Sequence, residues 1–150
     1  MLIYVAAPLF SVAERRFNAE LTGLLEAAEF DVFLPQRDGA ERDRLPYGAM
    51  PPEARRAAMF ELDVAKVIAC DVLLIVLDGR VPDEGACFEL GVAYAEKRRA
   101  QPRKRLIGLQ TDVRAAFLGA KLNPMLAVSL DVVVADETAL LEVLRTPAAP

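Results

Sequence analysis

The sequence predicts an α/β fold in which about five parallel strands form a doubly wound sheet with helices on both faces. Short apolar runs alternate along the chain with longer segments that have the spacing of amphipathic helices, and this alternation is typical of a parallel sheet. The 150 residues are 54% hydrophobic, which is enough for one buried core but not for two domains. No repeat, low-complexity tract or linker divides the chain, so we expect a single domain over residues 1–150.

The chain begins with a predicted strand, helix and second strand. Residues 2–7 (LIYVAA) are a short apolar run closed by a proline, which is typical of a buried strand. Residues 11–29 place apolar side chains along one helical face, and Ser11 with Glu14 fits a capping box at the start of that helix. Residues 30–35 (FDVFLP) give the second strand, again ended by a proline.

A long polar loop separates the second strand from the next helix. Residues 36–52 form this loop, and loops of such length in compact domains tend to be functional or disordered. A helix is predicted from about residue 51 to 69, with an apolar stripe along one side. Residues 71–78 (DVLLIVLD) contain a run of aliphatic side chains, which predicts a strand buried on both faces.

The second half of the chain continues the alternation. We expect a helix over 84–97, a strand over 105–110, a shorter helix over 112–119, a fifth strand over 125–134 and a last helix over 135–145. In open parallel sheets, ligands bind in the crevice beyond the carboxyl ends of the strands. Most of the segments that leave those ends are polar, so we expect the functional site there.

Composition and charge exclude several classes of function. The formal net charge of −4 offers nucleic acid no general attraction, and no apolar run reaches the roughly 18 residues of a membrane span. The first residues lack the basic segment of a secretory signal, so we expect a cytoplasmic protein. The chain has no histidine, which excludes Ser-His and Cys-His catalysis and removes the commonest metal ligand. We therefore expect chemistry based on carboxylates, hydroxyls, amides and arginines, without metal or cofactor, and we expect Cys70 and Cys87 to be reduced, buried thiols.

One carboxylate is out of place in the helix predicted over 84–97. Residues 85–95 are small or apolar apart from Glu89, and no Lys, Arg or Asn lies three or four positions away to pair with it. A buried and unpaired carboxylate costs several kcal/mol or raises its own pKa. Either Glu89 reaches solvent or a partner distant in sequence, or it lines the floor of a pocket as a nucleophile or general base.

Two further acids favour the pocket interpretation. Asp83 stands six residues before Glu89, where the exit loop of the strand meets the helix, and Asp63 lies on the preceding helix beside its apolar stripe. Taken alone, Asp83 fits a helix N-cap and Asp63 a solvated flank residue. Three acids that converge without histidine or metal suit glycosidic chemistry, in which one carboxylate attacks the anomeric carbon and another acid protonates the leaving group.

Four stretches together resemble the nucleoside 2-deoxyribosyltransferase family. They are YVAAPLF (4–10), FLPQRDG (33–39), FELDVAKVIACDVLLIVLDGRVPDEGACFELGVAYA (60–95) and NPM (123–125), and they cover nearly the whole chain in order. The resemblance implies a flavodoxin-like domain, a homo-oligomer, and partners that are nucleosides and free nucleobases. It also implies transfer of 2-deoxyribose between bases through a covalent glycosyl-glutamate.

The resemblance assigns expected roles to the catalytic residues. Glu89 matches the glutamate of the family's ELG motif and becomes the nucleophile, and Tyr4 is expected to orient that carboxylate. Asp63 and Asp83 are expected to serve base binding, proton delivery or sugar contact. The Pro-Asp-Glu stretch is shorter than in some relatives, so Glu84 is an alternative to Asp83.

The same resemblance suggests substrate-binding residues. Asn123 matches a residue that family members lend to the pocket of a neighbouring subunit, and Met125 and Gly79 are further expected contacts. Gln36 and Arg37 are candidates for holding the base, with plain loop surface as the alternative interpretation. The chain ends in TPAAP, so the C-terminal carboxylate that enters a neighbour's site in some members has no evident counterpart.

Three rival functions remain open at this point. A hydrolase of (deoxy)nucleoside 5′-monophosphates needs a phosphate cradle, for which the first loop offers only Ser11, with Arg80 and Arg114 as distant candidates. A receiver-type signalling module would use Asp78 as phospho-acceptor but lacks the acidic pair after the first strand. The basic residues of 97–105 could bind nucleic acid. The alternative interpretation is a solvated helix C-terminus, where positive charges complement the helix dipole.

Overall fold

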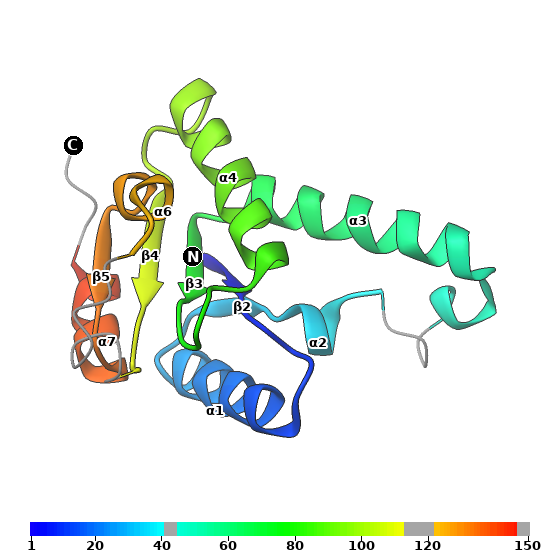
Figure 1. The fold of residues 1–150 in the computed structure, drawn as a ribbon, viewed down its shortest axis with the longest axis horizontal. Helices are drawn as coiled ribbons and strands as arrows, with labels where there is room; N and C mark the ends of the chain where they lie inside the picture. The colour runs from blue at the N-terminus through cyan, green and yellow to red at the C-terminus, as the bar shows by residue number, and fades with distance from the viewer. Residues whose placement is uncertain (41–44, 113–121, 147–150) are drawn as a thin grey trace.

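The computed structural model describes residues 1–40, 45–112 and 122–146. Within these residues one parallel sheet forms, with strand order β2-β1-β3-β4-β5 (Figure 1). This is the doubly wound, flavodoxin-like arrangement that the sequence predicts, and its strand order reverses between β1 and β3. The strands are β1 (Leu2–Ala6), β2 (Asp31–Phe33), β3 (Val72–Val76), β4 (Arg105–Leu109) and β5 (Val132–Val134).

Helices cover both faces of the sheet. Helices α1 (Val12–Ala27) and α7 (Glu137–Arg145) pack on one face, whereas α3 (Pro52–Ala69), α4 (Glu84–Arg99) and α6 (Pro124–Ser129) pack on the other. Because successive side chains of a strand point to opposite faces, each strand contributes to two cores. Tyr4 and Ala6 of β1 therefore face α3 and α4, and their neighbours in the strand face α1 and α7.

The central strand and the first helix form as predicted. All five residues of β3 are buried, as a strand covered on both faces requires. The N-terminus of α1 has the predicted capping box, in which the Ser11 Oγ accepts from the Glu14 N–H and the Glu14 carboxylate accepts from the Ser11 N–H.

Two predicted segments differ in the structure. The loop expected over 36–52 overlaps a short helix α2 (Pro35–Asp38) and contains a 3₁₀ turn η1 (Tyr47–Ala49). Helix α2 forms because a proline at its first position presets the backbone. The strand expected over 125–134 is wrong in its first half, which is helix α6. Short apolar runs are ambiguous between strand and helix, and here Asn123 caps a helix by accepting from the Met125 N–H. The helix expected over 112–119 lies almost entirely outside the described residues.

The basic segment 97–105 is partly structural rather than a solvated face. Lys104 is only 2% exposed, and its ammonium donates to the carbonyls of Val67 (2.8 Å), Ile68 (3.1 Å) and Cys70 (2.5 Å) at the end of α3. Arg105 donates to carbonyls at the end of α7. These cations compensate the unsatisfied carbonyls and the negative dipole end of a helix.

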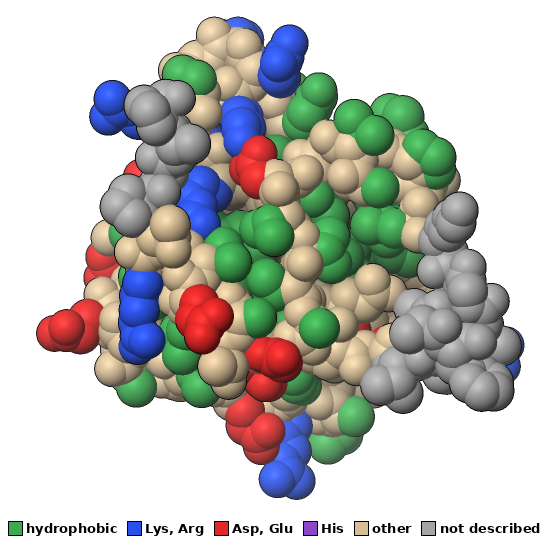
Figure 2. Space-filling view, turned by 90° about the vertical axis from the view of Figure 1, so that its left-hand side faces the viewer, with side chains coloured by type: hydrophobic (Ala, Val, Ile, Leu, Met, Phe, Trp, Pro, Cys, Tyr) green, Lys and Arg blue, Asp and Glu red, His purple; other side chains and the backbone are tan. Residues whose placement is uncertain are grey.

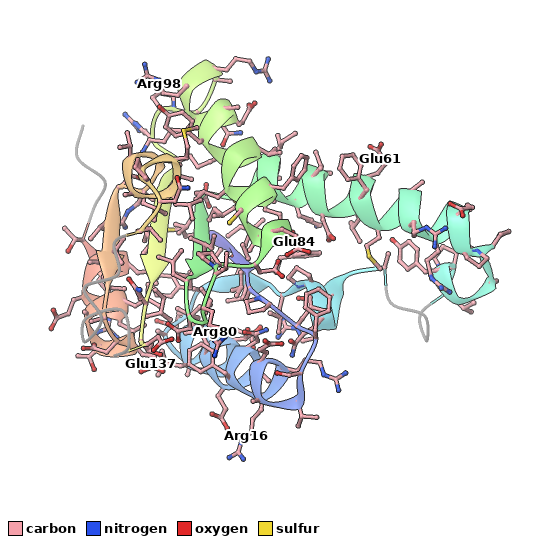
Figure 3. All side chains as sticks on the ribbon, in the orientation of Figure 1. Arg16, Glu61, Arg80, Glu84, Arg98 and Glu137 are labelled. Atoms are coloured by element: carbon pink, nitrogen blue, oxygen red, sulfur yellow. The ribbon has the colours of Figure 1, made fainter. Side chains whose placement is uncertain are left out.

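The surface charge of the described residues is mixed. The face shown in Figure 2 carries both basic and acidic side chains around a central hydrophobic area. Arg98 lies near the C-terminal end of α4, far from Arg80 in the loop after β3 (Figure 3). None of the described helices combines the length and the apolar character that a transmembrane helix needs.

Candidate active site

Glu89 has a partner that is distant in sequence. Tyr4 is completely buried in β1 on the side of α3 and α4, and its hydroxyl donates to the Glu89 Oε1 at 2.5 Å. A hydrogen bond from a phenol to an ionised carboxylate is shorter and stronger than one between two neutral groups. The half-buried carboxylate of Glu89 is therefore held in a fixed orientation by the central part of the sheet.

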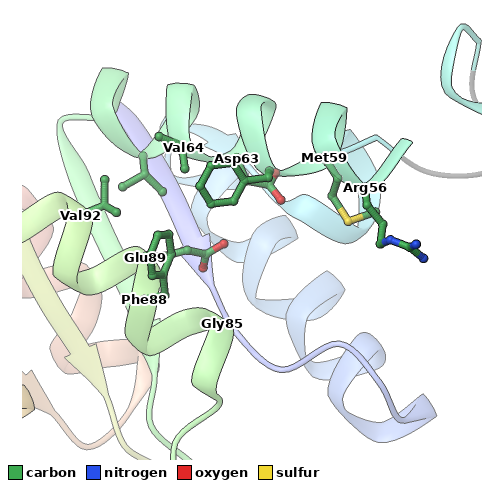
Figure 4. Close-up of a pocket in the computed structure, with 10 residues that line it drawn as sticks. Arg56, Met59, Asp63, Val64, Gly85, Phe88, Glu89 and Val92 are labelled. Atoms are coloured by element: carbon green, nitrogen blue, oxygen red, sulfur yellow. The ribbon is translucent and has the colours of Figure 1, made fainter. Parts of the chain in front are cut away.

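A cavity of about 330 Å³ lies between α3 and α4, and Glu89 lines it (Figure 4). This volume falls within the range of roughly 300–1,000 Å³ that is usual for small-molecule sites. The Asp63 carboxylate points into the same space from α3. The other lining residues are mostly small or apolar: Arg56, Met59, Phe60, Val64, Val67, Gly85, Phe88 and Val92.

The position of this cavity differs from the expectation. The sequence predicts a site made by loops at the carboxyl ends of the strands, but the cavity is lined by α3 and α4. Only Gly85, in the first turn of α4, lies close to such a loop. The helices supply the walls because both cover the same face of the sheet as Tyr4.

The environment of Glu89 raises its pKa to about 7, well above the ordinary value for a glutamate. Burial is the largest cause, and the negative charges of Asp63 and Asp83 act in the same direction, whereas the hydrogen bond from Tyr4 lowers the pKa. Burial, followed by the charge of Glu89, raises the pKa of Tyr4 far above its ordinary value, so Tyr4 remains a hydrogen-bond donor. Glu89 can thus exist as carboxylate or acid near neutral pH, which suits a nucleophile or a general base.

Asp83 is the N-cap of α4, next to the cavity rather than among its lining residues. Its Oδ1 accepts from the Ala86 N–H at 2.9 Å. A Cβ built on Gly85 would lie 3.1 Å from that oxygen, so glycine leaves room between the cap and the cavity. Glu84 is exposed in the first turn of α4 (Figure 3).

Gln36 and Arg37 tie α2 to α1 and do not line the cavity. Gln36 accepts from the Asn18 side chain at 3.1 Å and donates to the Arg15 carbonyl at 2.8 Å. Arg37 forms ion pairs with Glu26 and with its neighbour in sequence, Asp38. In this structure, both side chains therefore stabilise local structure.

Gly79, Asn123 and Met125 also lie outside the Glu89 cavity. Gly79 has a φ of 112°, a conformation that favours glycine, in the loop after β3. Met125 is 80% exposed and lines a second cavity of about 450 Å³ between α4 and α6. Asn123 caps α6 beside it. The structure therefore brings Tyr4, Glu89 and Asp63 together within one subunit, with Asp83 close by. Gly79, Asn123 and Met125 are not part of this group.

Asp78, the phospho-acceptor of the receiver interpretation, is used to join two loops. Its carboxylate accepts from the Thr111 N–H at 2.7 Å, from the Thr111 hydroxyl, and from the Asp112 N–H at 3.0 Å. A carboxylate with these bonds holds the loop after β3 against the loop after β4.

Metal ligands do not gather in the part of the chain that the structure describes. No group of three or more His, Cys, Asp or Glu residues there could hold a metal ion. Cys70 and Cys87 are free thiols, and Cys87 is only half-buried rather than buried as expected.

Two phenylalanines and an arginine of the cavity were missed by sequence reasoning. The rings of Phe60 and Phe88 lie 5.9 Å apart across α3 and α4, yet each is about half exposed (52% and 53%). Arg56 lies two helical turns before Asp63 on α3 (Figure 4). The available signal was position: Gly85 lies one helical turn before Glu89, and Phe60 and Arg56 lie one and two turns before Asp63.

Comparison with known proteins gives one family match. A family model described as nucleoside 2-deoxyribosyltransferase matches residues 3–142. No curated protein matches the chain significantly.

Several solved structures are similar over almost the full length. A conserved protein from Enterococcus faecalis V583 is 30% identical, with 95% of each chain covered and a TM-score of 0.68. A 2-deoxyribosyltransferase from Bacillus psychrosaccharolyticus is 19% identical, with both chains fully covered and a TM-score of 0.77. A CMP N-glycosidase from Clostridium botulinum is 18% identical, with 97% of this chain and 100% of that chain covered and a TM-score of 0.55. The last two likenesses show a shared fold.

Proposed function

Since the chain belongs to the nucleoside 2-deoxyribosyltransferase family, we propose that it transfers 2-deoxyribose from one nucleobase to another through a covalent bond between the sugar and Glu89. The observation that carries this proposal is the hydrogen bond from Tyr4 to Glu89 at the wall of a cavity. A carboxylate that a buried phenol holds in place, with open space beside it, suits attack on an anomeric carbon.

In the first half of the reaction, the nucleoside loses its base within the cavity. A Glu89 oxygen attacks C1′ of the sugar, and the N-glycosidic bond breaks with its electron pair moving to the base. The base takes a proton from an acid as it leaves. The transition state resembles an oxocarbenium ion, which forms more easily on deoxyribose because no electron-withdrawing 2′-hydroxyl is present.

In the second half, a different base enters the same space. A nitrogen of that base attacks C1′, the bond to Glu89 breaks, and the carboxylate is regenerated. The new base returns its proton to the acid, so atoms and protons balance over the cycle. Two inversions at C1′ give net retention.

The acids beside Glu89 have separate parts in this proposal. Asp63 faces the cavity from the opposite helix, so we assign it the proton that moves to and from the base. Asp83 lies at the start of α4, and we assign it contact with the sugar. With a pKa of about 7, Glu89 is ionised in a large fraction of molecules at neutral pH, as a nucleophile requires. Apolar walls limit the water that would otherwise hydrolyse the intermediate.

We further propose that a second copy of the chain completes the pocket. The N-terminal part of α3 projects beyond the sheet (Figure 1), and α3 and α4 expose Phe60, Phe88 and Tyr94. Exposed apolar patches of this kind are typical of protein interfaces. Asn123 and Met125, which lie away from their own subunit's Glu89 cavity, would contact substrate in the neighbour.

Hydrolysis of (deoxy)nucleoside 5′-monophosphates is the second candidate. Arg56 favours it, since this cation lines the cavity and suits a phosphate. Against it, the Glu14 carboxylate already accepts from the N–H groups of Phe10 and Ser11 in the first loop, and its negative charge would repel a phosphate there. We therefore rank exchange above hydrolysis.

The test is to incubate the protein with a deoxynucleoside and a different free base, and separately with a nucleoside 5′-monophosphate, and to separate the products by chromatography. Formation of the exchanged nucleoside supports transfer. Release of free base without exchange supports hydrolysis, and no turnover of either substrate rejects both. The Glu89→Ala variant should lose several orders of magnitude in rate yet remain folded, because alanine suits a helix.

A further inference from the structure

We propose that Phe33 is a positioning residue for this site: it holds the ring of Tyr4 so that the hydroxyl stays on Glu89, and Lys66 in turn holds Phe33. The inference rests on the proposed function, because it concerns how the nucleophile is kept in its reactive orientation. Neither Phe33 nor Lys66 lines the Glu89 cavity. Their influence therefore passes through Tyr4.

Register places Phe33 beside Tyr4. The two residues are direct partners across the parallel strands β1 and β2, so their side chains point to the same face of the sheet. Their ring centroids lie 5.5 Å apart with an interplanar angle of 17°, which is a stacked pair. Both rings are buried, and this stack limits how far the Tyr4 ring can tilt towards β2.

Phe33 itself needs support, because β2 is a three-residue strand at the edge of the sheet and Phe33 is its last residue. Lys66 of α3 supplies that support with its Nζ 5.4 Å from the centroid of the Phe33 ring. A cation within about 6 Å of a ring face is attracted by the negative charge of that face. A continuous chain of contacts thus runs from Lys66 of α3 through Phe33 of the edge strand β2 and Tyr4 of β1 to Glu89.

The geometry of the last contact explains why small movements of the ring matter. A tyrosine hydroxyl lies at the far end of its side chain, so a small change of χ1, which tilts the whole ring, moves it out of hydrogen-bond range of the Glu89 Oε1, now at 2.5 Å. Without that bond the carboxylate can rotate, and its attacking oxygen loses its alignment with C1′. Misalignment of a reacting group lowers the rate of the chemical step more than it weakens binding.

The charges around Glu89 provide an independent readout. The titratable groups that face it are Tyr4 from β1, Asp63 from α3 and Asp83 at the start of α4. The two acids and burial raise the pKa of Glu89, and the hydrogen bond from Tyr4 is the influence that lowers it. Loosening the Tyr4 ring should therefore raise the pKa of Glu89 above about 7.

The experiment compares Phe33→Leu and Lys66→Met with wild type and with a matched control. Phe17→Leu is that control, because Phe17 packs against the opposite core, on the side of α1 and α7. For Phe33→Leu we expect kcat for base exchange to fall about tenfold with little change in KM, and for Lys66→Met about threefold. NMR titration of the labelled Glu89 carboxyl should show a higher pKa in both variants and no change in Phe17→Leu.

A double-variant cycle tests the route through Tyr4. In a Tyr4→Phe background, Phe33→Leu should cause no further loss of kcat and no further change in the Glu89 pKa, since the hydrogen bond is already gone. Additive losses would overturn the proposal, as would a wild-type kcat and Glu89 pKa in Phe33→Leu.

Two other outcomes are also decisive. If Phe17→Leu lowers kcat as much as Phe33→Leu, the effect is a general loss of stability and the proposal is wrong. If Phe33→Leu does not fold, Lys66→Met carries the test, because Lys66 lies on a helix surface outside both buried cores. The titration of Glu89 needs no turnover. If the protein exchanges no base, the proposed function is wrong, but the effect of Phe33 on the pKa of Glu89 can still be measured.

Discussion

Replacing Glu89 by glutamine should remove a pH dependence from the free energy of unfolding. The folded protein raises the pKa of Glu89 from 4.5 to about 7, so the folded state binds the Glu89 proton more tightly than the unfolded state does. Stability from this group is therefore fully present below about pH 4.5 and is lost as the pH rises through about 7. A glutamine cannot ionise, but its amide oxygen can still accept from Tyr4.

The expected size follows from the difference between the two pKa values. At about 1.4 kcal/mol per pH unit, the shift corresponds to roughly 3 kcal/mol, of which about 2.5 kcal/mol is lost between pH 5 and pH 8. Urea unfolding curves of wild type and Glu89→Gln, measured across this interval, give the difference directly. The wild type should weaken relative to the variant as the pH rises.

A matched control separates this carboxyl from the rest of the protein. Glu61→Gln changes an exposed glutamate on α3 (Figure 3), and this variant should follow the wild-type profile because it retains Glu89. Parallel curves for wild type and Glu89→Gln, within about 0.5 kcal/mol from pH 5 to pH 8, would refute the conclusion that burial and neighbouring acids perturb Glu89.

Three further changes have defined outcomes. Asp63→Asn removes a negative charge that raises the pKa of Glu89, so the titration of the Glu89 carboxyl in an NMR experiment should move below about 7; an unchanged value would show that Asp63 exerts no field there. Gly85→Ala places a methyl group at the cavity wall, 3.1 Å from the carboxylate that caps α4, so this carboxylate must shift and KM for the nucleoside should rise several-fold. Gly23→Ala in α1, where nothing lies within 4 Å, is its control and should leave KM unchanged. Lys104→Met leaves three carbonyls at the end of α3 without their cation and should lower the free energy of unfolding by about 2–3 kcal/mol in urea; a loss below about 0.5 kcal/mol would contradict that role.

The order of elements could be predicted because hydrophobic periodicity reports which faces are buried. The run VLLIV of β3, with three β-branched residues, favours a strand covered on both sides. The run 125–134 does not discriminate, since a short apolar segment fits a helix or a strand, and the cap at Asn123 decided for helix. The role of Lys104 could not be predicted either, because its neighbours in sequence are basic whereas its partners are carbonyls of α3, 34 to 37 residues away.

For the site, the sequence supplied the unusual residue but not its surroundings. Glu89 is visible as a lone acid among small residues, and Asp63 and Asp83 as acids near it in the order of elements. The walls of the cavity depend on how α3 packs against α4, which periodicity does not specify, and so Phe60, Phe88 and Arg56 were missed. Phe33 was missed for another reason, because its role comes from strand register with Tyr4.

The central claim is that Glu89 forms a covalent bond to the sugar, and mass spectrometry of the acid-quenched protein tests it most directly. After incubation with a deoxynucleoside and no acceptor base, we predict that a peptide containing Glu89 gains the mass of one 2-deoxyribosyl group. Addition of a free base should remove that mass and yield the exchanged nucleoside. Base exchange by the wild-type protein with the added sugar on another residue, or undiminished exchange by Glu89→Ala, would contradict the claim.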